Sequence, residues 1–562
     1  MNIEIKNKLS RRNFIRVAGA GGLVLYLESR LGVRSASART LPRIPDISPI
    51  DRFLGDKAPA KFFADSEPER AHAVLWNKAS FLSSYNNRIP APQERVPLVV
   101  IGGGISGLTT AYLLRDFKPI VLEQAPNFGG NSKGQSWRGI DYAIGAAYLV
   151  KPDEGSDIEK LLQELHLGSK WREKGDGEPF ELNGAVKEHF WSGAAQDSGA
   201  AQFKKLSSYF QSIWDGEGEP FPEIPVIENE QRSYINKLDS ISFRTHLEKV
   251  AGGALDPLIE AAMEQYCWSS FGGTLSEISA ASGLNFYCAE FGEILALPGG
   301  NAAVAERLLT KIAEETTTAN LRVNSLVFDV TVTDDGVLVT YRDEKEEIRS
   351  IHAKAAVLAI PKFIAGRVLN GIEDDRMTAI RRLRYRSYLV ANVLINGSLD
   401  KEFYDLYLLG DGKINNQDLV GSVREQKVTD VILGNFASPT SKDTVLTLYR
   451  GFPYDGVRAE LYIPGSYERF RAEFETQIFD QILPLLKLKK GSVVDIRIAR
   501  WGHPLPLAAT GLIAEGVPDT LRKPFKEKVF FVEQDNWALP AFETAVGEAL
   551  HFAPLIRKKL QA

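Results

Sequence analysis

The sequence contains few of the residues that build disulfide frameworks and metal centres. Only two cysteines, Cys267 and Cys288, occur among 562 residues, and the seven histidines are scattered along the chain. One disulfide is the most that two cysteines allow, and spacing alone does not decide between that bond and two buried free thiols, the state we favour. No group of His, Cys, Asp and Glu has the spacing of metal ligands, so the sequence predicts no metal site.

Long apolar runs and internal repeats are also absent. No apolar stretch reaches the roughly 18 residues that a transmembrane helix requires, so no membrane span is expected. The composition, 44% hydrophobic and 25% charged, is that of a chain with two or three packed units. Residues 1–38 carry a net charge of +5, which leaves −10 on the remainder against −5 for the whole chain. That balance disfavours nucleic acid as a partner and favours cationic small molecules.

The N-terminus has the features of an export signal. The stretch from Ser10 to Ile15 contains the pair Arg11-Arg12, an uncharged segment follows, and residues 36–38 are small enough for cleavage. This pattern predicts a twin-arginine signal peptide over residues 1–38, recognition by the twin-arginine export machinery and a periplasmic or secreted location. A chance arginine pair on an amphipathic helix is the alternative.

A glycine-rich turn between two apolar runs is the most specific motif of the chain. Gly102, Gly104 and Gly107 form the pattern G-x-G-x-x-G, with Ser106 inside it, and Glu123 ends the next apolar run 21 residues after the first glycine. Strand, turn, helix, strand and acid make a dinucleotide-binding βαβ unit, in which the backbone approaches a pyrophosphate at a helix N-terminus. Glu123 is placed to bind a ribose hydroxyl. The alternative is a glycine turn that opens a helix and binds nothing.

A second glycine-rich segment follows the acid. Gly129-Gly130-Asn131 precedes a turn from Gly145 to Tyr148. This order resembles the flavin-containing amine oxidase family, whose first unit runs acid, loop, Gly-Gly-Arg and glycine-rich turn. The resemblance implies non-covalent FAD, with Gly130 and Asn131 near its phosphates and Tyr148 beside the flavin, although Tyr148 could equally be a core residue. Asn131 replaces the family's arginine, so a neutral contact stands where the family has a charge-assisted one.

Two later segments complete the resemblance. In the family, the strand corresponding to residues 327–330 binds adenine through a valine backbone, a role that we carry to Val327. A strand ending at Glu533 precedes a helix that begins near Ala541 and Phe542. The corresponding acid in the family holds the ribityl–phosphate region, and the helix N-terminus faces the flavin's pyrimidine carbonyl.

Three further residues are candidates for catalysis. The stretch from Arg500 to His503 resembles spermidine-dehydrogenase relatives, which implies that Trp501 lies beside the flavin. His503 is interpreted as a base or a substrate partner, with a structurally satisfied histidine as the alternative. Trp537 is interpreted as an aromatic-cage residue, with an ordinary packed tryptophan as the alternative. Together with Tyr148, these residues are the predicted catalytic set.

Two residues that the family usually has are missing. A lysine holds a water near flavin N5 in most amine oxidases, and Val390 occupies that position here. This replacement favours a dehydrogenase over an enzyme that reacts efficiently with oxygen. The arginine that clamps a carboxylate in L-amino-acid oxidases is also missing after the glycine turn, because Lys151 lacks the bidentate fork.

The sequence therefore predicts an α/β fold in which three segments assemble a Rossmann-type FAD domain around a mixed α+β substrate domain inserted twice. The expected boundaries are signal peptide 1–38, N-terminal extension 39–97, cofactor segments 98–160, 295–372 and 495–562, and substrate segments 161–294 and 373–494. The predicted function is that of an exported FAD-dependent oxidoreductase, acting on a carbon–nitrogen bond of an amine or polyamine. The alternatives are an FAD-dependent desaturase or porphyrinogen-type oxidase, and a non-catalytic flavin-binding protein.

Overall fold

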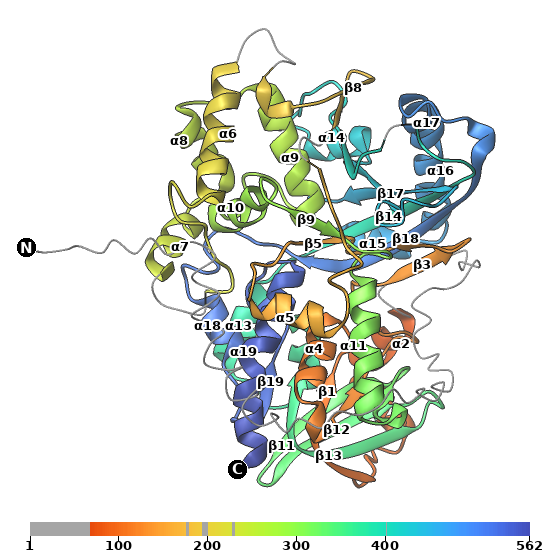
Figure 1. The fold of residues 1–562 in the computed structure, drawn as a ribbon. Coiled ribbons are helices and arrows are strands. Elements are labelled where there is room, and N and C mark those ends of the chain that lie inside the picture. Colours follow the sequence, from red (N-terminus) through yellow and green to blue (C-terminus); the bar gives the residue numbers. More distant parts are fainter. Residues whose placement is uncertain (1–67, 176–178, 194–199, 227–230, 401) are drawn as a thin grey trace, which may run out of the picture.

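The computed structural model describes residues 68–175, 179–193, 200–226, 231–400 and 402–562. The predicted signal peptide lies outside these ranges. Figure 1 shows one α/β unit, which contains both the first strand and the last helix, and a second region in which a large sheet lies beside a group of helices. In the part of the chain that is described, no helix has the length and apolar character needed to cross a membrane.

The first sheet has seven strands and is largely parallel at its centre. Strands β10, β2, β1, β13 and β19 pair in parallel, and β11 and β12 extend the sheet as an antiparallel hairpin on the other half of β13. The bounds of these strands are β1 Glu94–Ile101, β2 Ile120–Leu122, β10 Leu321–Arg322, β11 Leu326–Thr333, β12 Gly336–Arg342, β13 Ile348–Leu358 and β19 Val529–Phe531. Because strands from three distant parts of the chain share this sheet, the predicted three-segment cofactor domain and fold class are confirmed.

Apolar helices cover the first sheet on both faces. One face packs against α4 (Ile105–Leu113), α11 (Ala302–Glu315) and α19 (Phe542–Gln561). The other face packs against α2 (Pro68–Leu75) and α12 (Lys362–Val368). The strands between these layers read as nearly continuous apolar runs, as a sheet buried on both faces requires. α2 belongs to the predicted N-terminal extension, which is therefore part of the cofactor domain's packing.

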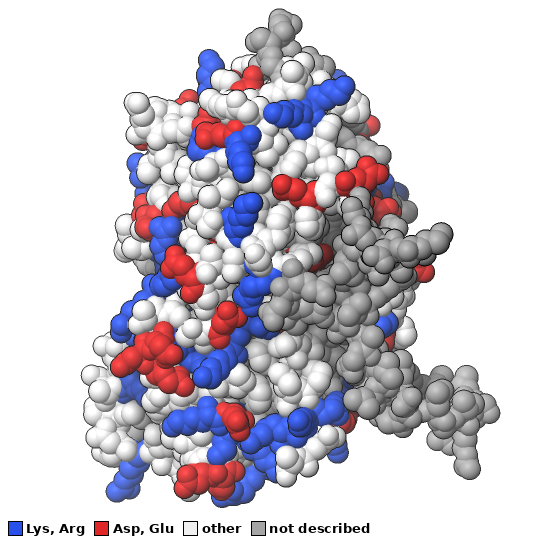
Figure 2. All heavy atoms as spheres, turned by 90° about the vertical axis from the view of Figure 1, so that its left-hand side faces the viewer, with Lys and Arg blue, Asp and Glu red and all other residues white. Residues whose placement is uncertain are grey.

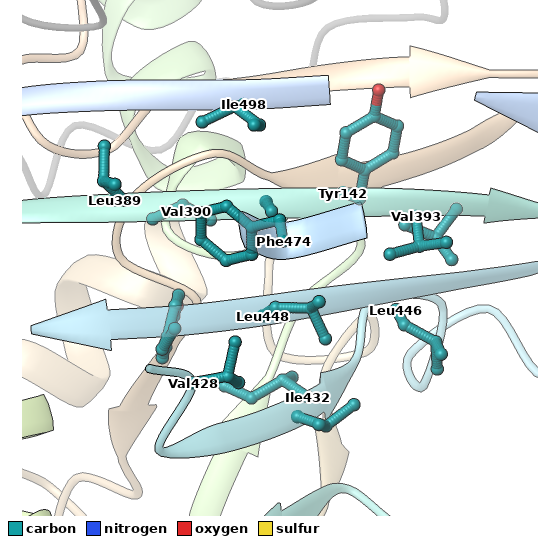
Figure 3. Close-up of a cluster of buried hydrophobic side chains, with 14 of the residues drawn as sticks. Tyr142, Leu389, Val390, Val393, Val428, Ile432, Leu446, Leu448, Phe474 and Ile498 are labelled. Atoms are coloured by element: carbon teal, nitrogen blue, oxygen red, sulfur yellow. The ribbon is translucent and has the colours of Figure 1, made fainter. Parts of the chain in front are cut away.

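The second sheet also has seven strands, in the order β18-β14-β17-β16-β15-β7-β8. Their bounds are β7 Phe180–Leu182, β8 Ala185–Lys187, β14 Tyr385–Ile395, β15 Asp405–Leu408, β16 Asp430–Leu433, β17 Thr444–Gly451 and β18 Val493–Pro506. β18 pairs with β14 along its length, so residues 495–506, which we assigned to the third cofactor segment, lie in this sheet. β1 likewise begins before the predicted start at residue 98. Figure 3 shows the apolar side chains of β14 and β17 packing with Phe474 from α16 (Ser466–Gln477).

A layer of helices completes the substrate region (Figure 1). Its members are α6 Ala200–Trp214, α7 Arg232–Asp239, α8 Phe243–Ala251, α9 Pro257–Phe271 and α10 Ala280–Ala289. They share one apolar cluster, in which both Cys267 and Cys288 are buried as free thiols. Between the two regions lie two small sheets, the hairpin of β3 Gly134–Trp137 with β4 Ile140–Ala143 and the triplet of β5 Tyr148–Val150, β9 Ile294–Ala296 and β6 Arg172–Glu173.

Charged side chains of both signs are mixed on the surface in view in Figure 2. Acidic and basic groups lie close to one another over the described part of this face. Mixed charges of this kind produce little net field at a distance.

Candidate active site

The predicted glycine turn lies where two strands and a helix approach most closely. Gly102 has φ +105°, and a Cβ added there would lie 2.2 Å from the carbonyl oxygen of Ala359 at the end of β13. A Cβ at Gly107 would lie 2.0 Å from the carbonyl oxygen of Gly102. Only glycine fits these positions. α4 begins after Gly104 without a side-chain cap, so the first N–H groups of the helix are directed to whatever the turn binds.

The second glycine segment lies directly against the first. The N–H of Gly129 donates to the carbonyl oxygen of Gly103 over 2.8 Å, and Gly104 and Gly129 form an isolated bridge. A Cβ at Gly130 would lie 2.9 Å from the Cα of Gly104. The backbone of both turns therefore forms one surface without side chains, as the close approach of a diphosphate requires.

Glu123 lies beside this surface and is 8% exposed. One carboxylate oxygen accepts from the N–H of Gly103 at 2.7 Å and the other from the N–H of Ala125 at 2.8 Å. The glycine turn thus fixes the orientation of the carboxylate. Glu123 lines the same cavity as Val327, so the predicted ribose and adenine positions lie together.

Two adjoining cavities run along the edges of the glycine segments. The larger has a volume of about 360 Å³ and the smaller about 200 Å³. Both are lined by Gly104, Gly130, Asn131, Ala359, Ile360, Pro361, Trp501, Pro504, Gln534 and Asp535. Only the larger is lined by Ser106, Tyr148, Glu533, Ala541 and Phe542, and only the smaller by Gly102, Glu123, Val327 and His503. An extended dinucleotide fits this pair of cavities, with its diphosphate at the glycine segments that they share.

Trp501 forms part of the wall between the two cavities. Its indole is 2% exposed and donates from Nε1 to the carbonyl oxygen of Ile144 over 2.8 Å. A Cβ at Gly145 would lie 3.0 Å from its ring, so the second glycine turn packs on the indole face. The ring is fixed by contacts on two sides, which suits a residue that lies against a flat cofactor.

Beyond the glycine segments, the larger cavity becomes a chamber with polar aromatic walls. Tyr148, Tyr266, Tyr388 and Tyr449 line it. The rings of Tyr388 and Tyr449 meet edge to face, with centroids 5.6 Å apart and an interplanar angle of 78°. The start of α19 at Phe542 lies at the same cavity, and its cap residue Ala541 forms no side-chain capping bond. A helix N-terminus therefore faces the space next to Trp501.

Carboxylates dominate the charge of this larger cavity. Among the described residues that line it, none is Lys, Arg or His, and five are acidic. These five are Glu223, Glu290, Glu533, Asp535 and Glu543. Glu290 accepts from the hydroxyl of Tyr266 at 3.3 Å and pairs at 2.7 Å with Lys174, which lies behind the lining. The space itself is acidic and aromatic, a combination that binds cations.

Comparisons with known proteins agree with this geometry. Residues 100–165 match the family model described as "NAD(P)-binding Rossmann-like domain". Oxidoreductase PigB from Serratia sp. is 22% identical over 526 residues, which cover 83% of this chain and 76% of that protein. The structure of a double mutant of putrescine oxidase superposes with a TM-score of 0.61 at 16% identity, over 83% of this chain and 99% of that one. Cyclohexylamine oxidase from Brevibacterium oxydans IH-35A superposes with a TM-score of 0.60 at 17% identity, over 83% of this chain and all of that one.

The chain has the fold of FAD-dependent amine oxidases, and its Rossmann-like unit is the part that would bind the cofactor. The glycine segments, Glu123 and the strand of Val327 line the space predicted for the dinucleotide, and Glu533 and the start of α19 line the larger cavity. The two glycine segments fit FAD because their backbones approach so closely that no side chain has room where the diphosphate would lie.

Trp537 does not lie at the chamber of the flavoenzyme, which corrects the aromatic-cage prediction. It is 1% exposed, lies outside both cavity linings, and donates from Nε1 to Glu548 on α19 over 2.9 Å. The preceding short helix, Gln534–Asn536, turns the indole into the apolar cluster of the helical layer. The alternative that we gave, a packed tryptophan, is the observed one.

His503 also lies away from the chamber, which corrects its predicted role as a base or substrate partner. It lines the smaller cavity only, where its ring is 4.6 Å from Phe363. Burial, together with the charges of Arg458 and His72, lowers its pKa well below the usual value for histidine. The ladder between β18 and β14 is irregular between Trp501 and Leu505, and Trp501 lines both cavities whereas His503 lines only the smaller one.

A buried ion pair beneath the flavoenzyme's cofactor site was not predicted. Lys362, 1% exposed at the start of α12, pairs with Glu533 and donates to Asn536 over 2.5 Å. Burial raises the pKa of Glu533 to about 8, against the opposing charge of Lys362. Asp535 accepts from the backbone N–H of Lys362 at 2.9 Å. A lysine directly after the apolar Ala-Ile-Pro strand end was the sequence signal for this pair.

A second buried carboxylate is linked to the chamber through hydrogen bonds. Asp430 on β16 is 3% exposed and accepts from Ser269 at 2.7 Å and from Thr429 at 2.5 Å. The oxygens of Ser269 and Tyr388 are 2.9 Å apart, and both residues line the chamber. Burial raises the pKa of Asp430 to about 6. A carboxylate with this pKa is suited to accept a proton near neutral pH.

Val390, which we aligned with the family's lysine, is a buried apolar residue in the structure. It is 1% exposed, lines the larger cavity, and belongs to the apolar cluster shown in Figure 3. The nearest polar residue on the strand, Asn392, accepts from Thr447 at 2.7 Å and lies outside the cavity lining. No group of three or more potential metal ligands occurs in the described part of the flavoenzyme.

Proposed function

We propose that this flavoenzyme oxidises the carbon–nitrogen bond of an amine that carries a positive charge in solution. The observation that carries the proposal is the acidic lining of the larger cavity, which contains five carboxylates and, among its described residues, no basic group. Tyrosine rings around the same space provide π faces for an ammonium group. The resemblance of the fold to putrescine oxidase and cyclohexylamine oxidase supports the same substrate class.

FAD, when bound, supplies the chemistry by accepting a hydride equivalent from the carbon next to the nitrogen. The chain's own residues orient the amine and exclude water around that carbon. The crossed rings of Tyr388 and Tyr449 and the indole of Trp501 provide rigid walls, because each ring is held by a hydrogen bond or by a neighbouring ring.

The amine must lose its extra proton before it can be oxidised, and the chamber contains a path for that proton. The substrate ammonium gives a proton to the hydroxyl oxygen of Tyr388, whose own proton passes to Ser269, and the serine proton passes to Oδ1 of Asp430. Asp430 ends as a neutral acid and the amine as the neutral base. The raised pKa of Asp430 supports this assignment.

A second amino group would have a site at Glu290. Its carboxylate lies at the end of the chamber formed by Tyr266, Asn285 and Phe286, with Lys174 behind it. We therefore extend the proposal to diamines and polyamines, in which one nitrogen reacts and another approaches Glu290. The acidic lining disfavours the alternative of a desaturase acting on a long apolar substrate, since such a substrate would have to displace water from polar carboxylates without replacing its contacts.

Anaerobic mixing of the holoenzyme with a panel of amines tests the proposal. The panel contains monoamines, diamines, polyamines and an uncharged polyene as a control. We expect the flavin absorbance band to bleach with at least one amine and not with the polyene. An intact band with every amine would refute amine oxidation, and bleaching by the polyene alone would favour a desaturase.

We further propose that the chain is exported with its cofactor by the twin-arginine machinery, on the basis of Arg11-Arg12 in a stretch outside the described residues. Fractionation of cells that express the full chain tests this. The parent should reach the periplasm or the medium, and the Arg11→Lys/Arg12→Lys variant should stay in the cytoplasm. Equal distribution of the two would contradict the proposal.

A further inference from the structure

The N-terminal extension lies against the smaller cavity, at the end predicted for the adenosine of FAD. Ala71 and His72 of α2 line this cavity, as does Trp76 directly after the helix. The same cavity is lined by Glu123, the predicted ribose ligand, and by Val327, the predicted adenine contact. Residues from outside the three cofactor segments therefore form part of the wall around the adenosine position.

An arginine of α2 ties this helix to the loops beside the adenosine position. The guanidinium of Arg70, whose side chain is 12% exposed, donates to the carbonyl oxygens of Asn324 and Asp343 over 2.9 Å each. It also donates to the carbonyl oxygen of Gln124, the residue after the predicted ribose ligand, over 3.4 Å. Because the guanidinium is planar and presents its donors in a fixed fork, several carbonyl partners hold α2 in one position.

The next helix, α3 (Lys78–Ser84), attaches the extension to β11. Lys78 pairs with Asp329 on that strand over 2.5 Å. The ring of Phe81 meets that of Phe328 edge to face, with centroids 5.2 Å apart. Since β11 also carries the predicted adenine contact, the extension and this wall of the cavity pack as one unit.

Trp76 presents a large aromatic surface at the cavity. It is 39% exposed, although the guanidinium of Arg367 on α12 lies 4.1 Å from its ring centroid and the ring of His72 meets it edge to face at 4.8 Å. These two contacts fix the indole, and the exposed part of it is available to a ligand. Leu326 and Ile364 add apolar surface to the same cavity. A flat aromatic base gains contact energy from such a lining.

We propose that α2 and Trp76 form a fourth cofactor-binding segment, which covers the adenine of FAD and is held in place by Arg70. The indole supplies the aromatic contact with the base, and Ala71 leaves room for it beside the helix. The extension thereby favours FAD over FMN, which lacks the adenosine, and slows the loss of a cofactor predicted to be bound without a covalent link. This inference rests on the cofactor assignment and not on the amine.

Binding of FAD and ADP to the apoprotein tests the assignment. ADP carries the adenosine and a diphosphate but no flavin, so a contact with adenine contributes to the binding of both ligands. We would measure the dissociation constant of FAD by flavin fluorescence and that of ADP by competition, for the parent, Trp76→Ala, Trp76→Phe and Arg70→Gln. Arg557→Gln is the matched control, because Arg557 ties α19 to the carbonyl oxygen of Leu113 over 2.8 Å and lines neither cavity.

Trp76→Ala should weaken the binding of FAD and ADP by the same factor, roughly tenfold. Trp76→Phe should lose less, since it keeps an aromatic face. Arg70→Gln should weaken both ligands at least as much as Trp76→Ala, because it releases α2. FMN should bind all variants alike, and Arg557→Gln should match the parent. Unchanged FAD affinity in Trp76→Ala would overturn the assignment, and so would a loss for FAD without an equal loss for ADP.

Hydrogen exchange of the parent protein provides a check that needs no variant. The amides of α2 should exchange several-fold more slowly when FAD or ADP is bound, because the ligand covers the helix. The amides of α8, which lines neither cavity, should exchange at the same rate with and without ligand. Unchanged exchange in α2 would overturn the assignment even if Arg70→Gln fails to fold. Both tests omit amines, so their failure leaves the amine proposal untouched, whereas a parent that binds no FAD would overturn the cofactor assignment and this inference together.

Discussion

Asp430 offers the sharpest quantitative test of the site, because burial shifts its pKa and thereby makes the free energy of unfolding depend on pH. The folded protein raises the pKa of this carboxyl from 3.8 to about 6. The folded state therefore binds more protons than the unfolded state between these values, so stability falls as the pH rises through this range. A difference of about two pKa units corresponds to about 3 kcal/mol, all of which is lost above the folded pKa.

The variant Asp430→Asn removes the titration and retains an oxygen that accepts from Ser269. Its free energy of unfolding relative to the parent should rise by about 3 kcal/mol between pH 4 and pH 8. Urea unfolding of the holoenzyme, followed by tryptophan fluorescence at each pH, measures this difference. Asp334→Asn, an exposed change in the turn between β11 and β12, controls for the loss of a surface charge.

A difference between parent and Asp430→Asn that stays constant over this pH range would refute the reasoning. So would an equal trend in the Asp334→Asn control. If an amine bleaches the flavin, the same variant provides a second reading. The rate of bleaching in the parent should rise through a pKa near 6, and this step should disappear in Asp430→Asn, because the proton acceptor is gone.

Three further predictions follow from the chamber and its surroundings. Glu290→Gln should raise KM for a diamine about tenfold with little change in kcat, because Lys174 would then face the second ammonium group. KM for a monoamine should change less. Steady-state kinetics with a diamine and a monoamine of matched length measures both effects. Trp537→Phe should lower the free energy of unfolding by about 2 kcal/mol without altering the flavin spectrum, because it deletes a buried hydrogen bond to Glu548. Trp501→Phe should instead shift the flavin spectrum and lower the free energy of unfolding by about 1 kcal/mol. Equal spectral shifts in both variants would contradict the placement of the two rings. Val390→Lys should speed the reoxidation of the reduced flavin by oxygen about tenfold in stopped-flow measurements. Val390→Met is the control for side-chain length. The absence of any acceleration in Val390→Lys would show that another residue limits the reaction with oxygen.

The cofactor domain was predictable because its signals are local. The strand, glycine turn, helix and acid from Val99 to Glu123 form one contiguous unit, and the hairpin turn at 334–336 and the apolar strand of 355–358 mark their own elements. The close backbone approaches at Gly102 and Gly107 depend on single residues, since no side chain fits at either position. Such features depend on backbone sterics within one segment, which a sequence displays directly.

The errors arose where the structure depends on pairing between distant segments. Trp501 and His503 come from one motif, yet β18 carries that motif in the second sheet, because its ladder partner is β14 and not a strand of the cofactor domain. Trp537 directly follows the short 3-10 helix Gln534–Asn536, and in a helix of this type one residue rotates a side chain by about 120°. The pairs Lys362–Glu533 and Arg458–His72 join residues 171 and 386 positions apart, and no spacing rule connects them.

Charge separates the two cavities that meet at Trp501. The larger has an acidic and aromatic lining, whereas the smaller is lined by the basic residues Lys133 and Arg458 as well as by the carboxylates of Glu123 and Asp535. A cationic amine is therefore favoured in the larger cavity, whereas an anionic diphosphate would lie at the glycine segments that the two cavities share. Because FAD carries its charge at the diphosphate and its reactive ring at the other end, this separation also fixes the direction in which the cofactor enters.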